Sequence, residues 1–135
     1  MASTITASDA SITITESISL GGVDRGGTHT RTISSVSEMD RRVMEVSSSA
    51  ETSLIDLDTS NGKGQFVRSN IRYIRITNLD DSNWIRVRFM KAGAETADVK
   101  VLASSTFMLS DGSMDVDGSA GSFSAFVDID DIKAQ

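Results

Sequence analysis

The stretch Ile71–Met90, IRYIRITNLDDSNWIRVRFM, decides the fold of this chain. It reads as two strands joined by a polar turn over residues 78–83. Side chains alternate along a strand, so the apolar residues of each strand share one face. Those residues are Ile74 and Ile76 on the first strand, and Ile85, Val87 and Phe89 on the second. The two apolar rows predict a hairpin that buries one face.

The opposite face of this predicted hairpin is rich in aromatic and arginine side chains. It carries Tyr73, Arg75, Trp84, Arg86 and Arg88, which include the only Tyr and the only Trp of the chain. These residue types often anchor protein interfaces. We therefore favour burial of this face against another protein over a solvated sheet surface, and over stacking on single-stranded nucleic acid. These five residues are the candidate partner-binding site.

Composition limits the classes of function. A chain of 135 residues, 39% hydrophobic and 24% charged, is expected to fold around one core. Its net charge of -6 disfavours nucleic-acid binding, because phosphate contacts need a basic face. The absence of Cys excludes disulfides and thiolate metal sites. No apolar run has the length of a membrane span and the N-terminus lacks a signal-peptide pattern, so we expect synthesis in a cytoplasm and no membrane partner.

Short segments of alternating polarity follow one another along the first half of the chain. Residues 1–10 are small and polar and predict a flexible N-terminal arm, whereas Ser11–Leu20 alternates and predicts a half-buried strand. The Gly-rich segment Gly21–Thr30 predicts a loop. Over residues 35–46 a capping box with helical spacing competes with an alternation typical of a strand, and we favour a strand over Met39–Val46.

The second half continues the pattern. Further strands are expected at Ser53–Thr59, Asp98–Leu102, Ser105–Leu109, Met114–Val116 and Ser122–Val127, before a charged tail, DIDDIKAQ. Several short strands without a long helix indicate an all-β fold, a compact antiparallel β-sandwich or barrel. The expected organisation is a flexible arm over residues 1–10 and a single β domain over residues 11–135.

Residues of catalytic type are present without a complete constellation. Gly21–Thr28 has the glycine spacing of a phosphate-binding loop, but Gly27 stands where Lys is required and no helix is expected to follow. The only histidine, His29, lies in a Gly- and Thr-rich loop, and the chain has no G-x-S-x-G elbow. We therefore expect a protein that is not an enzyme, with no catalytic residue and no cofactor.

Three aspartates, Asp111, Asp115 and Asp117, form a weak cation candidate. Their segment partly matches a calcium-binding loop, but Ser113 and Ser124 occupy the first and last ligand positions, so the closing bidentate carboxylate is missing. We expect no metal site there, with a looser cation site as the alternative.

Charge is segregated along the chain. Positive residues predominate between Arg68 and Lys91, and acidic residues predominate from Glu95 onward. These regions could attract one another between neighbouring copies, which would favour self-association. Solvated faces explain the same pattern about as well.

Several runs of sequence resemble small virion structural proteins of tailed phages, with marine cyanobacterial phages the nearest in character. These runs are SEMDRRVMEV (37–46), ETSLIDL (51–57) and RYIRITNLDDSNWIRVRF (72–89). The similarity extends through VKVLASSTFMLS (99–110) to DIDDIKAQ (128–135), and ITNLDDSNWIRVRF (76–89) is its most recognisable element. That element is structural rather than catalytic.

The resemblance implies a non-enzymatic, β-rich protein present in many copies on the virion. The leading expectation is a capsid decoration, or cement, protein that binds the major capsid protein, or copies of itself, at the capsid surface. The alternatives are a head–tail, tail or fibre-base component, or a carbohydrate-binding module for host adhesion. Such families often carry a further strand after the region matching DIDDIKAQ, so a last strand is expected to be lost or supplied by a neighbour.

Overall fold

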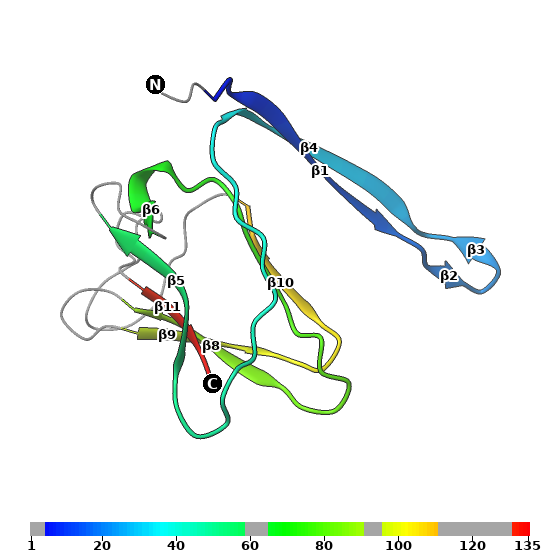
Figure 1. Cartoon of the computed structure of the whole chain (residues 1–135). Helices are drawn as coiled ribbons and strands as arrows, with labels where there is room; N and C mark the ends of the chain where they lie inside the picture. The colour runs from blue at the N-terminus through cyan, green and yellow to red at the C-terminus, as the bar shows by residue number, and fades with distance from the viewer. Residues whose placement is uncertain (1–4, 59–64, 91–95, 111–130) are drawn as a thin grey trace. The chain divides into compact units, whose positions relative to one another are not determined.

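The computed structural model describes residues 5–58, 65–90, 96–110 and 131–135 (Figure 1). Strands dominate these residues, which confirms the all-β fold predicted from the sequence. The chain divides into two compact units, Met1–Val43 and Met44–Gln135, where the sequence suggested an arm over residues 1–10 and one domain over residues 11–135. Each unit is described by itself below. No helix in the described ranges is long and apolar enough to cross a membrane.

The first unit is an antiparallel ribbon of two long strands (Figure 1). β1 (Ser8–Glu16) pairs with β4 (Gly27–Val36), and β2 (Ser19–Leu20) pairs with β3 (Val23–Asp24) at the tip. Residues 8–10, expected in the arm, therefore belong to a strand. Ile and Thr alternate over residues 12–15 of β1, and because both are β-branched they favour this extended backbone. The half-buried face expected for Ser11–Leu20 is instead largely exposed, with Ile14 at 41%.

The prediction of a loop over Gly21–Thr30 is wrong, because most of these residues lie in strands. Only its start is a tight turn, in which Gly21 and Gly22 have φ of 60° and 79°. This left-handed pair matches the two-residue turns that join antiparallel strands. β4 then begins at Gly27, because its alternating residues pair with β1 across the ribbon.

In its described residues, the second unit is a β-sandwich made of two sheets. The larger sheet has the order β6-β5-β11-β8-β9, and β10 pairs with β7 in the smaller one. Its elements are β5 (Thr52–Asp58), β6 (Gln65–Val67), a 3-10 turn (Arg68–Asn70), β7 (Ile74–Thr77), β8 (Ile85–Met90), β9 (Thr96–Val101), β10 (Thr106–Leu109) and β11 (Asp131–Ala134). All pairings are antiparallel except that of β5 with β6.

The core of the sandwich joins the inner faces of the two sheets. Val87 and Phe89 of β8 are fully buried, and Ile74 of β7 belongs to the same cluster. The ring centroid of Phe89 lies 5.6 Å from that of Phe107 on β10. This contact places the two sheets face to face over one core, as in other sandwiches.

The hairpin predicted between the two strands of Ile71–Met90 is wrong, although both strands exist. β7 pairs with β10, whereas β8 pairs with β9 and β11. Residues 78–84 connect β7 of the smaller sheet to β8 of the larger one, and residues 102–105 connect β9 of the larger sheet to β10 of the smaller one. We call these two connections together the corner of the sandwich.

Asn78 is the buried polar residue of the corner, with 5% of its surface exposed. Its side-chain amide donates hydrogen bonds to the backbone carbonyls of Asn83 at 2.8 Å and Leu102 at 3.1 Å, with the Val101 carbonyl at 3.3 Å. Its side-chain oxygen accepts from the N–H of Asp80 at 3.1 Å. One side chain therefore ties together both connections of the corner. Buried polar groups satisfied in this way fix a single arrangement.

Two other sequence predictions need correction. The strand expected over Met39–Val46 is absent, since residues 37–51 have no regular secondary structure, and Met39 and Val43 are exposed. The charged tail instead contributes β11, the middle strand of the larger sheet, where Ala134 is buried.

The predicted strands Met114–Val116 and Ser122–Val127 lie outside the described residues. The strands expected near Ser53–Thr59, Asp98–Leu102 and Ser105–Leu109 are confirmed as β5, β9 and β10.

A substitution at Gly26 tests how closely its backbone approaches that of Glu16 near the tip of the ribbon. A Cβ at Gly26 would lie 2.1 Å from the backbone oxygen of Glu16, whereas a Cβ at Gly27 would meet nothing within 4 Å. We expect Gly26→Ala to destabilise the ribbon by about 1–3 kcal/mol, as overpacking does elsewhere. Amide hydrogen exchange of β1 and β4 measures the loss, and Gly27→Ala is the matched control. Equal amide protection of β1 and β4 in the two variants would show that the close approach at Gly26 does not limit the size of the side chain there.

Asn78 tests the corner itself. Asn78→Ala leaves carbonyls and an N–H of the corner without their partner, and each such group costs about 1–3 kcal/mol when it stays buried. We expect the free energy of unfolding in urea to fall by at least about 2 kcal/mol. Asn83→Ala, a change to an exposed residue in the same connection, should cost less. A loss no larger than that of the control would contradict the role assigned to Asn78.

Candidate functional site

Three large apolar side chains are exposed at the corner of the sandwich. Leu79 is 70% exposed, Trp84 is 52% exposed and Leu102 is 57% exposed. Trp84 directly precedes β8 and Leu102 directly follows β9, and the paired residues Ile85 and Val101 close the ladder beside them. We call Leu79, Trp84 and Leu102 the corner patch.

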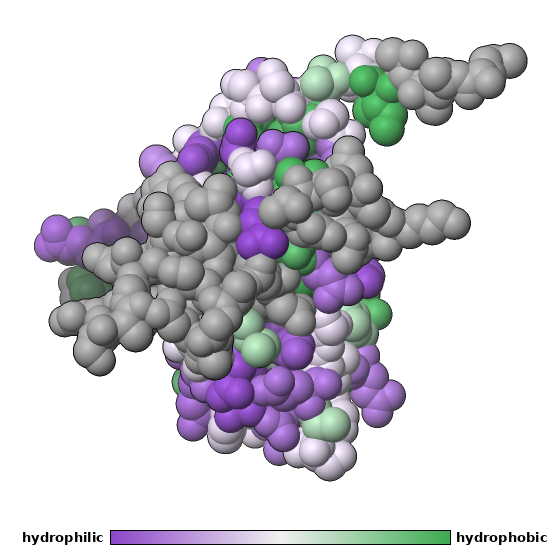
Figure 2. Space-filling model, turned by 90° about the vertical axis from the view of Figure 1, so that its left-hand side faces the viewer, coloured by the Kyte–Doolittle hydropathy of each residue, from purple (hydrophilic) through white to green (hydrophobic). Residues whose placement is uncertain are grey.

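The corner patch groups its exposed apolar side chains on neighbouring connections of the second unit. Hydrophilic side chains cover much of the lower part of the face shown in Figure 2, with separate apolar residues between them. Single exposed apolar residues of that kind need no partner. Three that leave the same corner, one of them a Trp, are the kind of surface that binds another macromolecule.

The connection that carries the patch is held by its own hydrogen bonds. The Asp80 carboxylate accepts from the N–H of Ser82 at 2.8 Å and from the N–H of Asn83 at 2.7 Å. The Asp80 carbonyl accepts from the N–H of Ser104 at 2.9 Å, which joins the two connections. The patch is thus presented by a structured turn, which reduces the entropy lost when a partner binds.

These hydrogen bonds also act on the ionisation of Asp80. The N–H of Asn83, then that of Ser82, and then the Asn83 side chain stabilise the charged carboxylate. They lower the pKa of Asp80 below its ordinary value of 3.8. The turn is therefore stabilised by a carboxylate that stays ionised at neutral pH.

Lys100 adds a positive charge to the corner patch. Its ammonium nitrogen lies 4.5 Å from the centroid of the Trp84 ring, within the range of a cation–π interaction. Lys100 reaches the ring from β9, where it pairs with Arg86 of β8. The patch thus offers an aromatic anchor beside a cation, which suits an apolar partner surface bordered by acidic groups.

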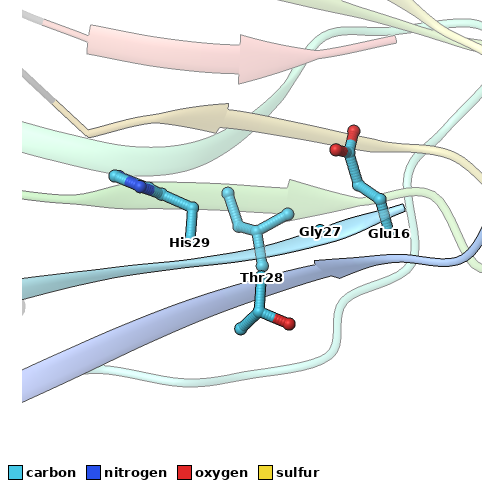
Figure 3. Close-up of a pocket in the computed structure, with 5 residues that line it drawn as sticks. Glu16, Gly27, Thr28 and His29 are labelled. Atoms are coloured by element: carbon cyan, nitrogen blue, oxygen red, sulfur yellow. The ribbon is translucent and has the colours of Figure 1, made fainter. Parts of the chain in front are cut away.

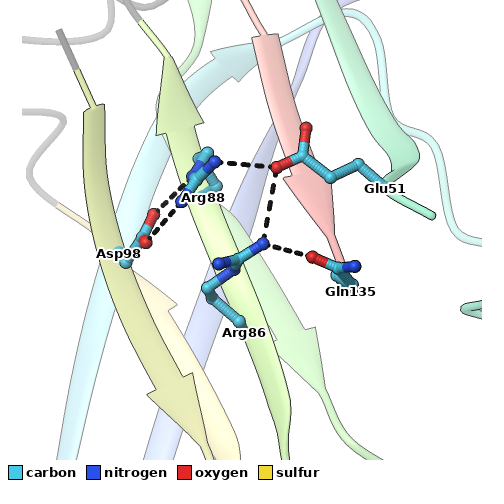
Figure 4. A network of polar contacts seen from close by, with 5 residues as sticks. All are labelled: Glu51, Arg86, Arg88, Asp98 and Gln135. Carbon is cyan, nitrogen blue, oxygen red and sulfur yellow. Dashed lines mark hydrogen bonds and ion pairs between the residues drawn. The ribbon is translucent and has the colours of Figure 1, made fainter. Parts of the chain in front are cut away.

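Arg86 and Arg88 take part in a polar network within the chain (Figure 4). Arg88 donates two hydrogen bonds to the Asp98 carboxylate, both at 2.8 Å, and a third to Glu51 at 2.9 Å. Arg86 lies 3.5 Å from the same Glu51 oxygen and donates to the side chain of Gln135. Two arginines therefore face two carboxylates, and much of their charge is balanced inside the sheet.

The network shifts the ionisation of its members. The hydrogen bond from Arg88 lowers the pKa of the Asp98 carboxyl, against a smaller opposing effect of desolvation. The same bond to Asp98 raises the pKa of Arg88. Both shifts favour the charged pair, so the network stabilises the sheet rather than leaving cations free for a partner.

The structure does not bring the five predicted site residues onto one face. Trp84, Arg86 and Arg88 share the outer face of the larger sheet, since Val87 and Phe89 turn inward between them. Arg75 lies on β7 of the smaller sheet, on the side opposite the buried Ile74, and Tyr73 directly precedes that strand. The Tyr73 hydroxyl donates to the sulfur of Met108 on β10 at 3.6 Å. The alternation along each strand is confirmed, and the composite face is wrong, because β7 and β8 do not pair.

Sequence reasoning missed Leu79, Lys100 and Leu102. The signal for the last two is the alternation of Asp98, Lys100 and Leu102: Asp98 and Lys100 pair with Arg88 and Arg86, and Leu102 directly follows β9. Finding these two required the pairing of β8 with β9, which local sequence does not give.

The ribbon carries a shallow depression around His29 (Figure 3). It is lined by Ile14, Glu16, Gly27, Thr28 and His29. Glu16 and His29 point to one side of the ribbon, whereas the side chain of Thr28 points to the other. These three residues do not assemble a hydroxyl–imidazole–carboxylate triad, which needs all three groups on one side.

Acid titration tests the structured turn. Because the folded-state pKa of Asp80 is depressed, its contribution to stability is present above 3.8 and is lost as the pH falls through the folded pKa. NMR titration of the Asp80 carboxyl should give a midpoint below 3.8. Asp80→Asn keeps an acceptor oxygen but removes the charge, so its difference in unfolding free energy from the wild type should shrink between pH 7 and the acid limit. A midpoint at or above the ordinary value would show that the turn does not hold the carboxylate.

Among the described residues, neither metal binding nor similarity to known proteins gives further support for a functional site. Among residues 5–58, 65–90, 96–110 and 131–135, no group of three His, Cys, Asp or Glu side chains could hold a metal ion. The weak cation candidate of Asp111, Asp115 and Asp117 lies outside the described residues. No protein-family model, curated protein or solved structure matches this chain.

Proposed function

We propose that this chain is a non-enzymatic structural protein of a tailed-phage particle, which decorates and stabilises the major capsid lattice. The observation that carries the proposal is the corner patch, an exposed Trp84 with Leu79 and Leu102 on a structured turn. The resemblance of sequence runs between residues 37 and 135 to phage virion proteins supports the choice of a tailed-phage particle. The partners would be the major capsid protein and further copies of this chain, on a capsid surface assembled in the host cytoplasm.

The chemistry of the patch suits a repeating protein surface. An exposed Trp supplies a large contact area and is among the residue types most often found as interface anchors. Lys100 beside the ring would meet acidic groups at the rim of the contact. Arg86 and Arg88 are engaged with Asp98 and Glu51, so docking would not require these two cations to find new partners.

The test is binding to DNA-filled heads that lack tails. We expect the wild-type chain to cosediment with such heads. Trp84→Ala should weaken binding by about 2 kcal/mol or more, roughly 30-fold, because it removes the anchor. Arg75→Ala is the matched control: Arg75 is also exposed but lies on the smaller sheet, so binding should be unchanged.

The other outcomes separate the alternatives. Binding of both variants as tightly as the wild type would remove the corner patch from the contact. Copurification with tails and not with heads would assign the chain to the tail apparatus. Binding to host polysaccharide, abolished by Trp84→Ala and without binding to heads, would indicate an adhesion module.

A further inference from the structure

The ribbon of the first unit has two open edges. Among the described residues, β1 and β4 pair with each other and with no third strand. An isolated two-stranded ribbon is marginally stable in water, and within this unit's described residues Ile33 is the one buried apolar side chain. An edge with unpaired backbone groups is also a template for another strand.

The two edges are not equivalent. β4 carries Arg31 near its middle, and the pairing of the two strands is irregular between Ser8 and Ala10 of β1, at the end where β4 contains Ser35 with a φ of 59°. Charged residues and irregular registers are devices that protect edge strands from pairing. In β1 the charged residues Asp9 and Glu16 lie at or next to the two ends, and the run ASITIT between Asp9 and Glu16 contains no charge, no Gly and no Pro. Such a run is typical of segments that pair strand to strand.

We propose that the β1 edge docks on β1 of a second copy of this chain, antiparallel and centred on Ile12. The two ribbons would then form one four-stranded sheet across a twofold axis. This pairing specifies how two copies of the chain would contact each other, and it does not depend on binding to a capsid.

Charge selects this arrangement. With Ile12 opposite Ile12 of the second copy, all nine residues of β1 overlap, Glu16 faces Ser8 and Asp9 faces Thr15. A parallel pairing in register would instead oppose Asp9 to Asp9 and Glu16 to Glu16, and like charges directly opposite are destabilising. Pairing β4 with itself about Arg31 would bring the two Arg31 side chains opposite each other. The antiparallel β1 pairing avoids all of these conflicts.

The side chains of the two ribbon faces also match across the proposed axis. Ala10, Ile12 and Ile14 share one face of β1, so the exposed Ile14 would gain Ala10 of the second copy as its neighbour. The other face carries hydroxyls, with the oxygens of Thr13 and Thr30 already 3.0 Å apart within one ribbon. Pairing would extend an apolar row on one face and a hydroxyl row on the other. Cross-strand pairs of both kinds stabilise sheets.

A charge swap at Ile12 tests the twofold pairing. The wild-type full chain should sediment as a dimer, and Ile12→Glu and Ile12→Lys should each raise the dimer dissociation constant at least about tenfold, because like charges then face each other. Mixing the two variants should restore dimers, since opposite charges then meet. Ile12→Glu would also face Arg31 within its own ribbon, which preserves the ribbon, and amide exchange of β4 verifies this.

Single cysteines test the register with little change in charge or size. The chain has no Cys, so Ser11→Cys mixed with Thr13→Cys should form a mixed disulfide under mild oxidation, because these positions face each other across the axis. Thr32→Cys mixed with Thr30→Cys is the matched control: these positions pair with Ser11 and Thr13 on the same ribbon but lie on the β4 edge. They should not cross-link.

Either experiment can overturn the proposal. A wild-type chain that stays monomeric up to about 100 µM, or variants that dimerise as well alone as when mixed, would exclude the β1 pairing. Equal cross-linking of the β4 pair would assign the docking edge to β4 instead. Should Ile12→Lys lose the ribbon, the cysteine pairs decide alone.

Discussion

The sandwich depends on the hydrogen bonds of one buried amide, that of Asn78. Two connections join the larger and the smaller sheet at the corner, and each has backbone groups that a continuous ladder would have paired. The Asn78 side chain satisfies carbonyls from both segments, and its own N–H donates to the Ser105 carbonyl at 2.9 Å. Because buried polar groups without partners are costly, these bonds set where the strands change sheets. The position of Trp84 and Leu102 follows from that choice.

The corner also determines where the exposed apolar residues of the corner patch lie. Strands that change sheets must expose residues at the point of exit, and here those residues are apolar. Asp80 stiffens one connection, and Lys100 covers part of the Trp84 ring. Next to them, the Arg88–Asp98–Glu51 network balances charge within the larger sheet. One outer face of the sandwich therefore has a neutralised centre and an apolar, cationic corner.

The sequence alone predicted the features that follow from side chains alternating every two residues along a strand. The alternation in β1, β7 and β8 identified these strands and the inward direction of Val87 and Phe89. It could not reveal that residues 78–83 span a corner, because a polar turn within one sheet has the same composition. The strand order is likewise nonlocal: β11 has a charged sequence, and its central place comes from pairing with β5 and β8 on either side. Of the candidate site, Trp84 was found from composition, whereas Lys100 and Leu102 required the pairing of β8 with β9.

The central claim is that the corner patch is the surface by which the sandwich binds a capsid. Hydroxyl-radical footprinting of the chain, free and bound to DNA-filled heads, measures it at single residues. The account predicts that Trp84 and Leu102 lose reactivity on the heads, while Met108, which is exposed on the smaller sheet, stays as reactive as in the free chain. Undiminished oxidation of Trp84 on saturated heads, or protection confined to Met108, would contradict it.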